Sequence, residues 1–596
     1  MKRQVTSLFI VSAVLSGSLF APVAINEAHA AVVQQNMTVK KEMVLVEGME
    51  KSVSFIEINK IKLHSVQELA KMMSASITYN QKTKTYTITK GIGKNKKTIQ
   101  LTQNSNVYVV NGKKSKLGIP AKLEQKTLFV QATPLVKALG GDILTDKNLL
   151  ISVNGSFKLG SSKLMVDGTG KQVNTFTVNG KQLYSVQDIS KLFSATTTIG
   201  KNNEITLSKQ GKTLKFKLLS KVLQNNGTSM KLVASPVHVK GIVYADLNDI
   251  VTAFGGDVQK LNSSLFVATS GLVSGDTFAP QFINEKTLLV TNNDRSVLLD
   301  TQTKKASWTI NATDLIVSPN GKKAVYSDET GFMHLVDFET KMDTVVNAED
   351  DSLKVEFVWS SDGTKVYFLQ GDKNEKISYM TITDGKVTKV FEDKLTYKSD
   401  LHLSFDGKKV LYVVGKEGTT KYTDDDKTDV DSIDLTGTEP QIYSIDLESK
   451  EVKADQLTTT NDNKVFSMFL KNAGIVYLSA KTDSEELPEL KILYGVDETT
   501  VLVKNKDIIS SLVTPQGKLV ILVAEENSMS TLYEVNTDTK GLRKLAQTNL
   551  QLTSFTTSPD GKSLVATTPG EDGEIVVVWK NGQFEALTKN KGANNK

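Results

Sequence analysis

Ser558-Pro-Asp-Gly-Lys562 decides the fold of this chain, because the same turn recurs throughout its second half. The other copies are Ser318-Pro-Asn-Gly-Lys322, Ser361-Asp-Gly-Thr-Lys365, Ser404-Phe-Asp-Gly-Lys408 and Thr514-Pro-Gln-Gly-Lys518. Aspartate or asparagine before glycine closes a tight turn through local hydrogen bonds. Apolar runs such as Ala324-Val-Tyr326 and Val410-Leu-Tyr412 follow the turns and predict β-strands.

The spacing of these turns predicts the architecture of residues 276–590. Gly321, Gly363 and Gly407 stand 42 and 44 residues apart, which matches one four-stranded propeller blade. With two degenerate copies the sequence predicts an all-β propeller, with seven blades favoured and six or eight as alternatives. The turns resemble those of TolB-like and WD-repeat-like propellers of exported proteins, which implies partner docking at the axial faces. A short tail at 591–596 follows.

A different repeat occupies residues 51–270. It consists of a short helix that ends at Ser-Ala or Gly-Gly, a pair suited to a helix C-terminus, and a strand that follows. The four helical stretches are 63–75, 129–141, 183–195 and 243–256. Two copies make one small α+β domain. We therefore expect domains at 51–155 and 156–270, preceded by a linker at 31–50.

These two domains resemble the copper amine oxidase N-terminal-like "stalk" domain of exported Gram-positive bacterial proteins. The family's usual Val-Pro-Leu-Arg motif before the helix is replaced in all four copies, for example by His64-Ser-Val-Gln67 and Ala245-Asp-Leu-Asn248. The resemblance therefore implies the fold, but no arginine-based binding site.

Copper chemistry is not supported by the residues present. A copper amine oxidase core needs histidine ligands and a tyrosine that becomes a quinone. Beyond residue 30 the histidines are His64, His238, His334 and His402, which are scattered singly, and the chain has no cysteine. We expect no copper centre and no cofactor apart from the calcium ion considered below, and we interpret each histidine as a surface or packing residue.

The N-terminus indicates export. Lys2 and Arg3 precede an apolar run that closes at Ala28-His-Ala30, the layout of a cleaved signal peptide at 1–30. No other stretch approaches the roughly 18 consecutive apolar residues of a membrane span. We expect a secreted protein, associated with the wall of a Gram-positive cell, with no transmembrane segment after cleavage.

Charge is sorted between the two halves of the chain. Residues 31–275 hold 33 lysines against 14 carboxylates, whereas residues 276–596 hold 37 basic and 51 acidic residues. Two surfaces of opposite sign imply different partners, or attraction between them.

The basic half contains a candidate polyanion site. Its lysines are Lys82, Lys84, Lys90, Lys94, Lys96, Lys97, Lys113, Lys114 and Lys116, on or beside predicted hairpins. Lysine is a mobile point charge that suits polyanions without a fixed geometry. We expect an anionic cell-wall polymer or surface glycan as the ligand; the alternative is that the lysines only keep an exported domain soluble. Nucleic acid is not expected, because aromatic residues do not interleave with the basic ones.

An acidic insertion at 416–440 interrupts the propeller period. Asp424, Asp426, Asp429 and Asp431 are candidate ligands for calcium, which takes about six to eight oxygens. The glycine and glutamate of an EF-type loop are missing, so a solvated acidic loop is the alternative.

The sequence favours a binding or scaffold protein over an enzyme. It contains neither a Gly-x-Ser-x-Gly nucleophile motif nor a phosphate-binding loop. The favoured function is attachment to the cell envelope through the basic domains and docking of a protein or peptide on the acidic propeller. Because paired carboxylates can meet only in space, the alternative is an exported hydrolase or lyase with its site in the propeller channel.

Overall fold

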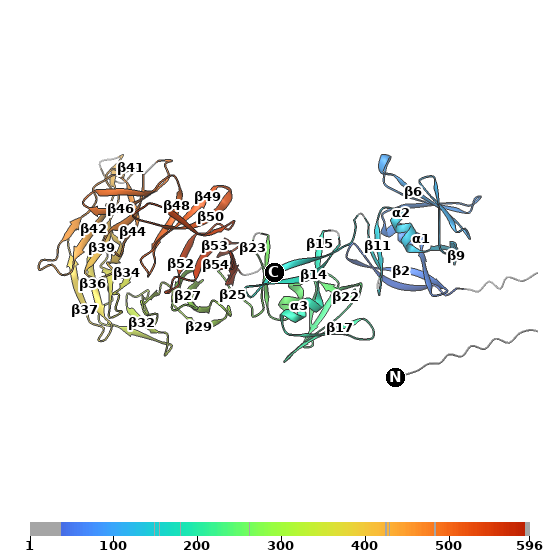
Figure 1. Ribbon diagram of the computed structural model, residues 1–596, viewed down its shortest axis with the longest axis horizontal. Coiled ribbons are helices and arrows are strands. Elements are labelled where there is room, and N and C mark those ends of the chain that lie inside the picture. Colours follow the sequence, from blue (N-terminus) through green and yellow to red (C-terminus); the bar gives the residue numbers. More distant parts are fainter. Residues whose placement is uncertain are drawn as a thin grey trace, which may run out of the picture. The chain divides into compact units, whose positions relative to one another are not determined.

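The computed structural model describes residues 37–590, apart from 148, 154, 179, 262, 424, 425, 428, 482 and 483. The signal peptide expected at 1–30 and the tail at 591–596 lie outside the described residues. Among the described residues the chain divides into two compact units: unit one comprises 37–42 and 52–140, and unit two comprises 43–51 and 141–590 (Figure 1).

Unit one contains two short helices and two groups of strands. The first group lies in the order β2 (Met49–Ile58), β3 (Ile61–Ser65), β10 (Thr127–Val130), β9 (Lys122–Glu124). The second is a five-stranded sheet in chain order, made of β4 (Ser76–Asn80), β5 (Thr85–Lys90), β6 (Lys97–Thr102), β7 (Val107–Val110) and β8 (Lys113–Lys116). Helix α1 (Val66–Met72) contacts β4, and α2 (Ala132–Ala138) contacts β6.

Unit two begins with one strand that the sequence did not predict. Part of the expected linker is strand β1 (Lys40–Val46), which pairs in parallel with β12 (Leu149–Ser152). Strand β12 in turn pairs with β11 (Asp142–Thr145). The segment is a strand because Val44, Leu45 and Val46 are all buried.

The second stalk domain lies entirely within unit two. Its larger sheet has the order β21 (Val237–Val239), β22 (Ile242–Ala245), β15 (Lys181–Ser185), β14 (Thr169–Val178), β13 (Lys158–Val166), β24 (Ser264–Ala268), β23 (Asp257–Leu261). Its five-stranded sheet comprises β16 (Thr196–Ile199), β17 (Glu204–Lys209), β18 (Lys212–Lys217), β19 (Val222–Asn225) and β20 (Thr228–Lys231). Helices α3 (Val186–Leu192) and α4 (Leu247–Ala253) contact each other, and α3 also contacts both sheets.

The helices begin and end as their sequences indicate. Ser65 and Ser185 cap α1 and α3 by accepting hydrogen bonds from backbone N–H groups of the first turn. After α1, Ser74 adopts the left-handed conformation (φ 55°), and after α2 Gly140 does the same (φ 82°). All four α-helices among the described residues have seven residues, and none is long and apolar enough to cross a membrane.

One carboxylate of the second stalk domain makes folding pH-dependent. Asp249, the third residue of α4, accepts a hydrogen bond from the Val233 backbone N–H at 2.8 Å. Burial, assisted by the nearby Asp246, raises its pKa to about 6. A raised folded-state pKa stabilises the domain below pH 4, and this contribution is lost as the pH rises through 6. We expect Asp249→Asn to stabilise the domain by about 1–3 kcal/mol at pH 7 and to change little at pH 4.

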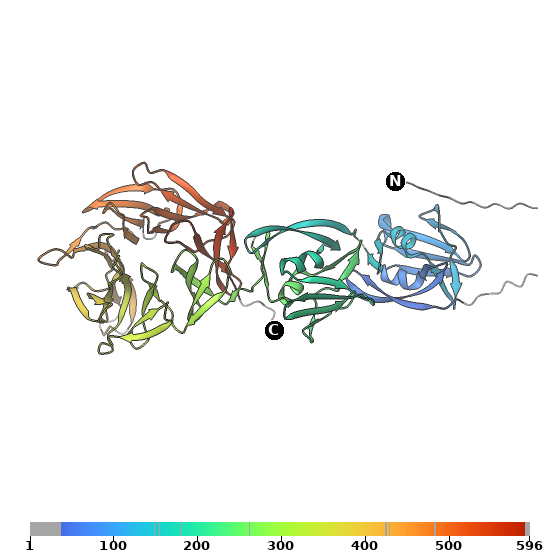
Figure 2. The same cartoon turned by 60° about the horizontal axis from the view of Figure 1, so that its bottom comes forward.

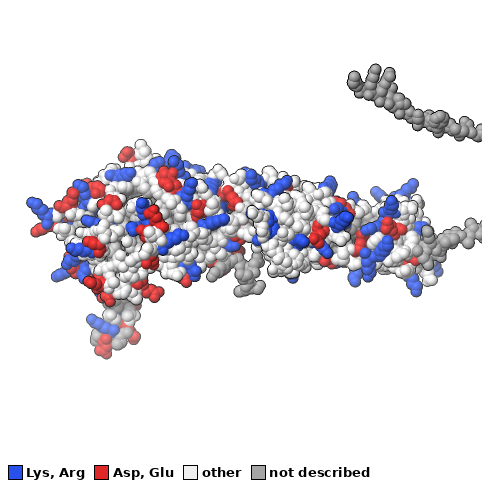
Figure 3. All heavy atoms as spheres, turned by 90° about the horizontal axis from the view of Figure 1, so that it is seen from below, with Lys and Arg blue, Asp and Glu red and all other residues white. Residues whose placement is uncertain are grey.

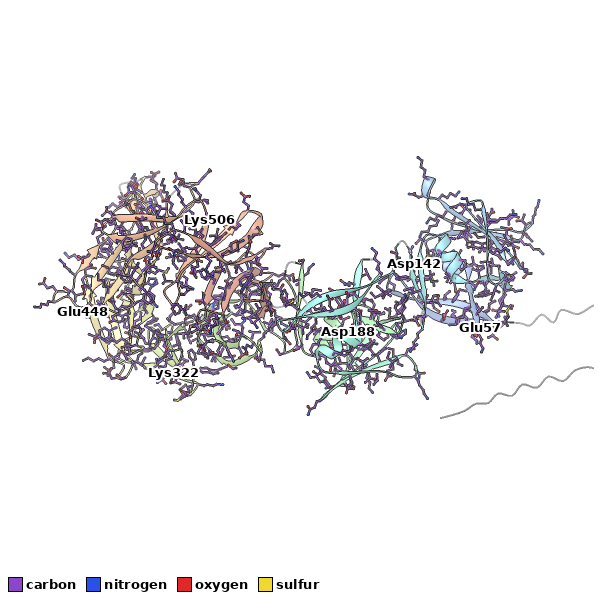
Figure 4. The ribbon with its side chains drawn as sticks, viewed as in Figure 1. Glu57, Asp142, Asp188, Lys322, Glu448 and Lys506 are labelled. Atoms are coloured by element: carbon purple, nitrogen blue, oxygen red, sulfur yellow. The ribbon has the colours of Figure 1, made fainter. Side chains whose placement is uncertain are left out.

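Thermal unfolding at the two pH values tests this expectation. Asp188 is the matched control, because it is the third residue of α3 (Figure 4). Burial of Asp188 is outweighed by hydrogen bonds from Asn174, which hold the pKa of its carboxyl below the ordinary value. Asp188→Asn should therefore destabilise at pH 7. The same change in melting temperature at both pH values for Asp249→Asn would contradict the assignment.

The second part of unit two is a β-propeller. Among the described residues it contains seven four-stranded antiparallel sheets, which follow one another in a ring (Figure 2). The first three sheets are β26–β29 (Thr277–Phe282, Thr287–Asn292, Arg295–Asp300, Ala306–Ile310), β30–β33 (Ile316–Val317, Lys323–Ser327, Met333–Asp337, Met342–Val346) and β34–β37 (Lys354–Trp359, Lys365–Gln370, Lys376–Thr381, Val387–Glu392). The fourth is β38-β39-β42-β43 (Lys398–Leu403, Lys409–Val414, Gln441–Asp446, Ala454–Gln456). The last three are β44–β47 (Asn463–Phe469, Ile475–Ala480, Glu489–Gly495, Glu498–Val503), β48–β51 (Asp507–Val513, Leu519–Glu525, Met529–Val535, Leu542–Thr548) and β52–β55 (Ser554–Thr557, Leu564–Gly570, Gly573–Lys580, Gln583–Ala586).

The ring closes between its first and last sheets. Strand β26 contacts β52, β53 and β54, and β25 (Val273–Ser274) pairs in parallel with β56 (Thr588–Lys589). Lys304 of the first sheet lies 3.5 Å from Glu585 of the last, and both side chains are almost fully buried. Strands and charges from the two ends of the propeller sequence therefore hold the ring together.

The repeated turns have the geometry that their residues predict. Asp362 accepts hydrogen bonds from the Ser360 hydroxyl (2.6 Å) and the Thr364 N–H (3.0 Å), and Gly363 has a φ of 72°. These hydrogen bonds hold the pKa of the Asp362 carboxyl below its ordinary value. Turn residues such as Lys322 and Glu448 lie at the edge of the propeller (Figure 4). The aspartates act as turn formers, as predicted.

Three buried lysines at the start of innermost strands were not predicted. Lys354, Lys398 and Lys464 are 1%, 0% and 2% exposed, and they belong to three consecutive sheets. Each ammonium group donates to backbone carbonyl oxygens and contacts one nearby aspartate. Most of these carbonyls belong to the loop that leads into the strand, whereas those of Gly331 and Glu375 belong to turns of the preceding sheet. Each lysine therefore fixes its loop from inside the protein.

Candidate polyanion-binding surface

The five-stranded sheet β4–β8 is the frame of the candidate site. Ile88 and Ile99 pair with each other and are fully buried, so this face of the sheet belongs to the core. The opposite face carries Thr78, Thr87 and Gln100 in one cross-strand row. This second face is polar and open to solvent.

The structure places all nine predicted lysines on this sheet or in its connections. Lys90 lies on β5, Lys97 on β6, Lys113, Lys114 and Lys116 on β8, Lys82 and Lys84 in the β4–β5 turn, and Lys94 and Lys96 between β5 and β6. The sequence predicted two separate hairpins. The pairing of β6 with β7 joins them into one sheet, so the lysines form one basic surface.

The strand register divides these lysines between the two faces. Lys114 lies opposite Val109, in the same row as Gln100, and therefore on the open face. Lys90 pairs with Lys97, two residues along each strand from the paired Ile88 and Ile99. Both lysines therefore lie on the same face as the buried isoleucines, at the end of the strands. The basic surface thus covers the open face and extends around the ends of the sheet.

The charge of this surface is not neutralised locally. Residues 76–116 contain nine lysines and no carboxylate. Leaving Lys90 aside, none of these lysines forms an ion pair with any residue that the structure describes. In the propeller, by contrast, lysines and carboxylates are interspersed (Figure 3), as in the Lys323–Asp337 pair at 2.8 Å. The sheet therefore carries a positive potential that attracts anions.

A histidine–carboxylate pair lies on β38, the strand that contacts the first strands of both neighbouring sheets. The innermost strand β38 bulges at Asp400 (φ 54°), whose carboxylate lies 3.1 Å from His402 Nε2. The other carboxylate oxygen accepts hydrogen bonds from the backbone N–H and the hydroxyl of Ser467 in the next sheet. Burial raises the pKa of the Asp400 carboxyl, but the contact with His402, together with the hydrogen bonds from Ser467, outweighs burial and holds the pKa below its ordinary value.

Asp400 is one of several side chains on the first strands that link neighbouring sheets. The side chain of Gln281 accepts from the Val317 N–H and donates to the Leu315 carbonyl of the following sheet. Glu356, also at a bulge with positive φ, accepts from the Leu401 N–H. One oxygen of Asp400 makes such a link and the other contacts His402 of the same strand, so its geometry is that of a structural carboxylate. The hydrolase or lyase alternative stays a prediction.

The acidic insertion forms a hairpin instead of an irregular loop. Strands β40 (Thr419–Tyr422) and β41 (Val430–Asp434) pair only with each other among the described residues. Tyr422 faces Val430, and Ile433 lies on the same side; the two aliphatic side chains are each 57% exposed. The insertion therefore has an apolar face in solvent as well as its acidic residues.

The calcium prediction falls on this hairpin. Asp431 lies on β41 and Asp426 and Asp429 lie in its turn, whereas Asp424 lies outside the described residues. Within the described part of the chain, no group of three or more histidine, aspartate or glutamate side chains is placed to hold a metal ion. Calcium binding stays a prediction.

The histidines are paired with carboxylates, which the sequence did not indicate. His64 contacts Glu42, and His238 lies 3.2 Å from Asp146. His334 is flanked by two aspartates, one on each ring nitrogen. His64 and His238 are each 5% exposed, so they are packing residues with a polar partner. No local sequence signal joins His64 to Glu42 or His238 to Asp146, because these partners are 22 and 92 residues apart in the chain.

Comparison with known proteins identifies the two repeated domains. The copper amine oxidase N-terminal domain family matches residues 46–149 and again 165–268. No curated protein matches the chain. Among solved structures, an oligogalacturonate lyase in complex with manganese is 11% identical (TM-score 0.40) and aligns over 54% of this chain and 88% of its own. TolB from Acinetobacter baumannii is 13% identical (TM-score 0.30; 55% and 77%), and the tricorn protease 10% (TM-score 0.39; 93% and 62%).

Proposed function

Because the chain carries two copper amine oxidase N-terminal domains followed by a propeller, we propose that it is an exported binding protein of the cell envelope. In this proposal the sheet β4–β8 attaches the molecule to an anionic wall polymer or surface glycan. The observation that carries it is the nine lysines of 76–116 with no carboxylate among them. A domain that needs lysines only for solubility has no need to exclude carboxylates, because aspartate and glutamate serve solubility at least as well.

The propeller is the second contact surface in this proposal. The exposed apolar face around Val430 and Ile433 is of the kind that marks protein interaction sites. An isolated two-stranded hairpin is marginally stable in water, so a partner that covers this face would also stabilise it. Aspartates flank the face, which favours a partner peptide or protein that carries basic residues.

Charge reversal on the edge strand tests the envelope attachment. Lys113, Lys114 and Lys116 are all exposed, so their replacement by glutamate leaves the core intact. We expect the triple variant to bind purified wall polymer at least about 10-fold more weakly, because it loses three weak attractions and gains three repulsions. Cosedimentation of the full mature chain with cell walls, over a salt series from about 50 to 500 mM, measures the effect.

A matched control separates local charge from net charge. Lys60, Lys71 and Lys126 are exposed lysines of the same unit that lie outside the sheet. Their reversal changes the net charge equally and should weaken binding much less. Wild-type binding that does not weaken with salt, or equal losses in the two variants, would reject the attachment surface.

A further inference from the structure

The second stalk domain repeats the basic sheet of the first. Residues 196–231 form the sheet β16–β20, with the same strand order as β4–β8. This segment contains seven lysines and one carboxylate, Glu204. None of the seven lysines forms an ion pair with a residue that the structure describes. The hairpin lysines of the first domain therefore have counterparts in the second.

The open face of this second sheet has the same chemistry as the first. Lys215 lies in one row with Thr206 and Gln224, as Lys114 lies in the row of Gln100. Lys217, opposite Glu204, and Lys231 lie on the same face. Leu214 and Phe216 point to the other side and are buried. The face therefore presents hydroxyl, amide and ammonium groups to solvent.

Neither face has the features of a site for a single small anion. The lysines are spread over an open sheet, and ammonium groups on flexible stems fix no geometry around one ligand. Each exposed ion pair contributes only a fraction of a kilocalorie, up to about 1 kcal/mol. When one ligand engages both faces of the chain, the second contact is intramolecular and the overall affinity rises. Two weak faces therefore bind tightly chiefly to a ligand that can engage both.

We infer that β16–β20 is a second binding surface, and that the ligand is a linear polymer of repeating anionic groups. This inference rests on the proposed function, because it takes the first sheet to bind a polyanion. It adds a second site and a requirement for ligand length. A polymer with phosphate or carboxylate in every repeat meets that requirement, whereas a single phosphate does not.

Graded poly(glycerol phosphate) oligomers of about 3, 10 and 40 repeats are the probes for the test, with the full mature chain at constant salt. We expect the affinity per phosphate to rise steeply with length, by about 100-fold between the shortest and the longest probe. The variant K215E/K217E/K231E should lose most of this gain. The remaining face of this variant should bind the shortest probe with the wild-type affinity. The number of short probes bound per chain should fall from two to one.

Two control variants test whether a loss of binding comes from the change in net charge or from unfolding. The variant K158E/K171E/K240E reverses three exposed lysines of the same domain outside the sheet and should keep most of the length dependence. The neutral variant K215Q/K217Q/K231Q should lose a smaller part of the length dependence. Its melting temperature should equal that of the wild type, which excludes unfolding as the cause of the loss.

The outcomes separate the two proposals. If K215E/K217E/K231E binds the longest probe like the wild type, the second surface is wrong and the attachment through β4–β8 survives. A wild-type affinity per phosphate that is equal for all lengths also overturns the inference. If no probe binds at low salt, the proposed function itself fails.

Discussion

Replacing Lys398 by methionine is expected to lower the free energy of unfolding of the propeller by about 3–5 kcal/mol. The ammonium group is fully buried and donates to the Asp393 carboxylate at 2.7 Å and to the Glu375 carbonyl at 3.0 Å, and it also contacts the Leu395 carbonyl. Methionine has a similar shape but no donor. It therefore leaves the two carbonyl groups without this donor. Asp393, whose side chain is 23% exposed, keeps its hydrogen bond from the Leu395 N–H but loses the ammonium group.

Calorimetry of the propeller transition measures this loss. Lys394→Met is the matched control, because Lys394 lies four residues away and is exposed, and it should change stability by less than about 0.5 kcal/mol. Removing both charges with Lys398→Met and Asp393→Leu should recover a large part of the loss, because no unpaired charge then remains. A Lys398→Met protein as stable as the control would show that the buried lysine does not hold its loop.

Lys304→Met is expected to have an effect of similar size, about 3–5 kcal/mol, at the closure of the ring. Its partner Glu585 has no exposed surface, and Glu585 Oε1 has no hydrogen-bond partner among the described residues. Burial holds the pKa of Lys304 below its ordinary value, although Glu585 opposes this effect. Loss of the ammonium group leaves the glutamate buried with neither oxygen compensated.

A double-mutant cycle with Glu585→Leu isolates the pair. We expect each single replacement to destabilise the propeller strongly and the double replacement to cost much less than their sum. Chemical unfolding of the four proteins gives the coupling energy. Additive effects would mean that the pair contributes nothing to ring closure beyond its separate contacts.

Local signals in the sequence were enough to predict most of the secondary structure. The turn around Asp362 needs only an aspartate, a glycine and their neighbours, and the caps of α1 and α3 need only a serine before the helix. Strand β1 was missed because its pairing partner, β12, lies about a hundred residues away in the chain. The hairpin β40–β41 was missed because its many aspartates concealed the alternating apolar residues.

The sequence predicted only part of the candidate site, because local features are visible in a sequence and long-range pairing is not. The lysines of 76–116 are a compositional feature, visible without a structure. Which of them share a face depends on strand register, which places Lys114 beside Gln100 and turns Lys97 to the other side. Only the structure shows that the second sheet, β16–β20, is equivalent to β4–β8, because the two sheets have the same strand order.

The sequence by itself determined the modules, their repeats and the separation of charge between them, because turns, helix ends and composition depend on residues close together in the chain. The tertiary structure alone decided which charges are buried and which stay in solvent. Lys398 and Lys114 are the same amino acid, yet one is enclosed by carbonyl oxygens and the other is exposed to solvent. The reason is physical: burial and pairing depend on groups brought from distant parts of the chain, and only folding brings them together.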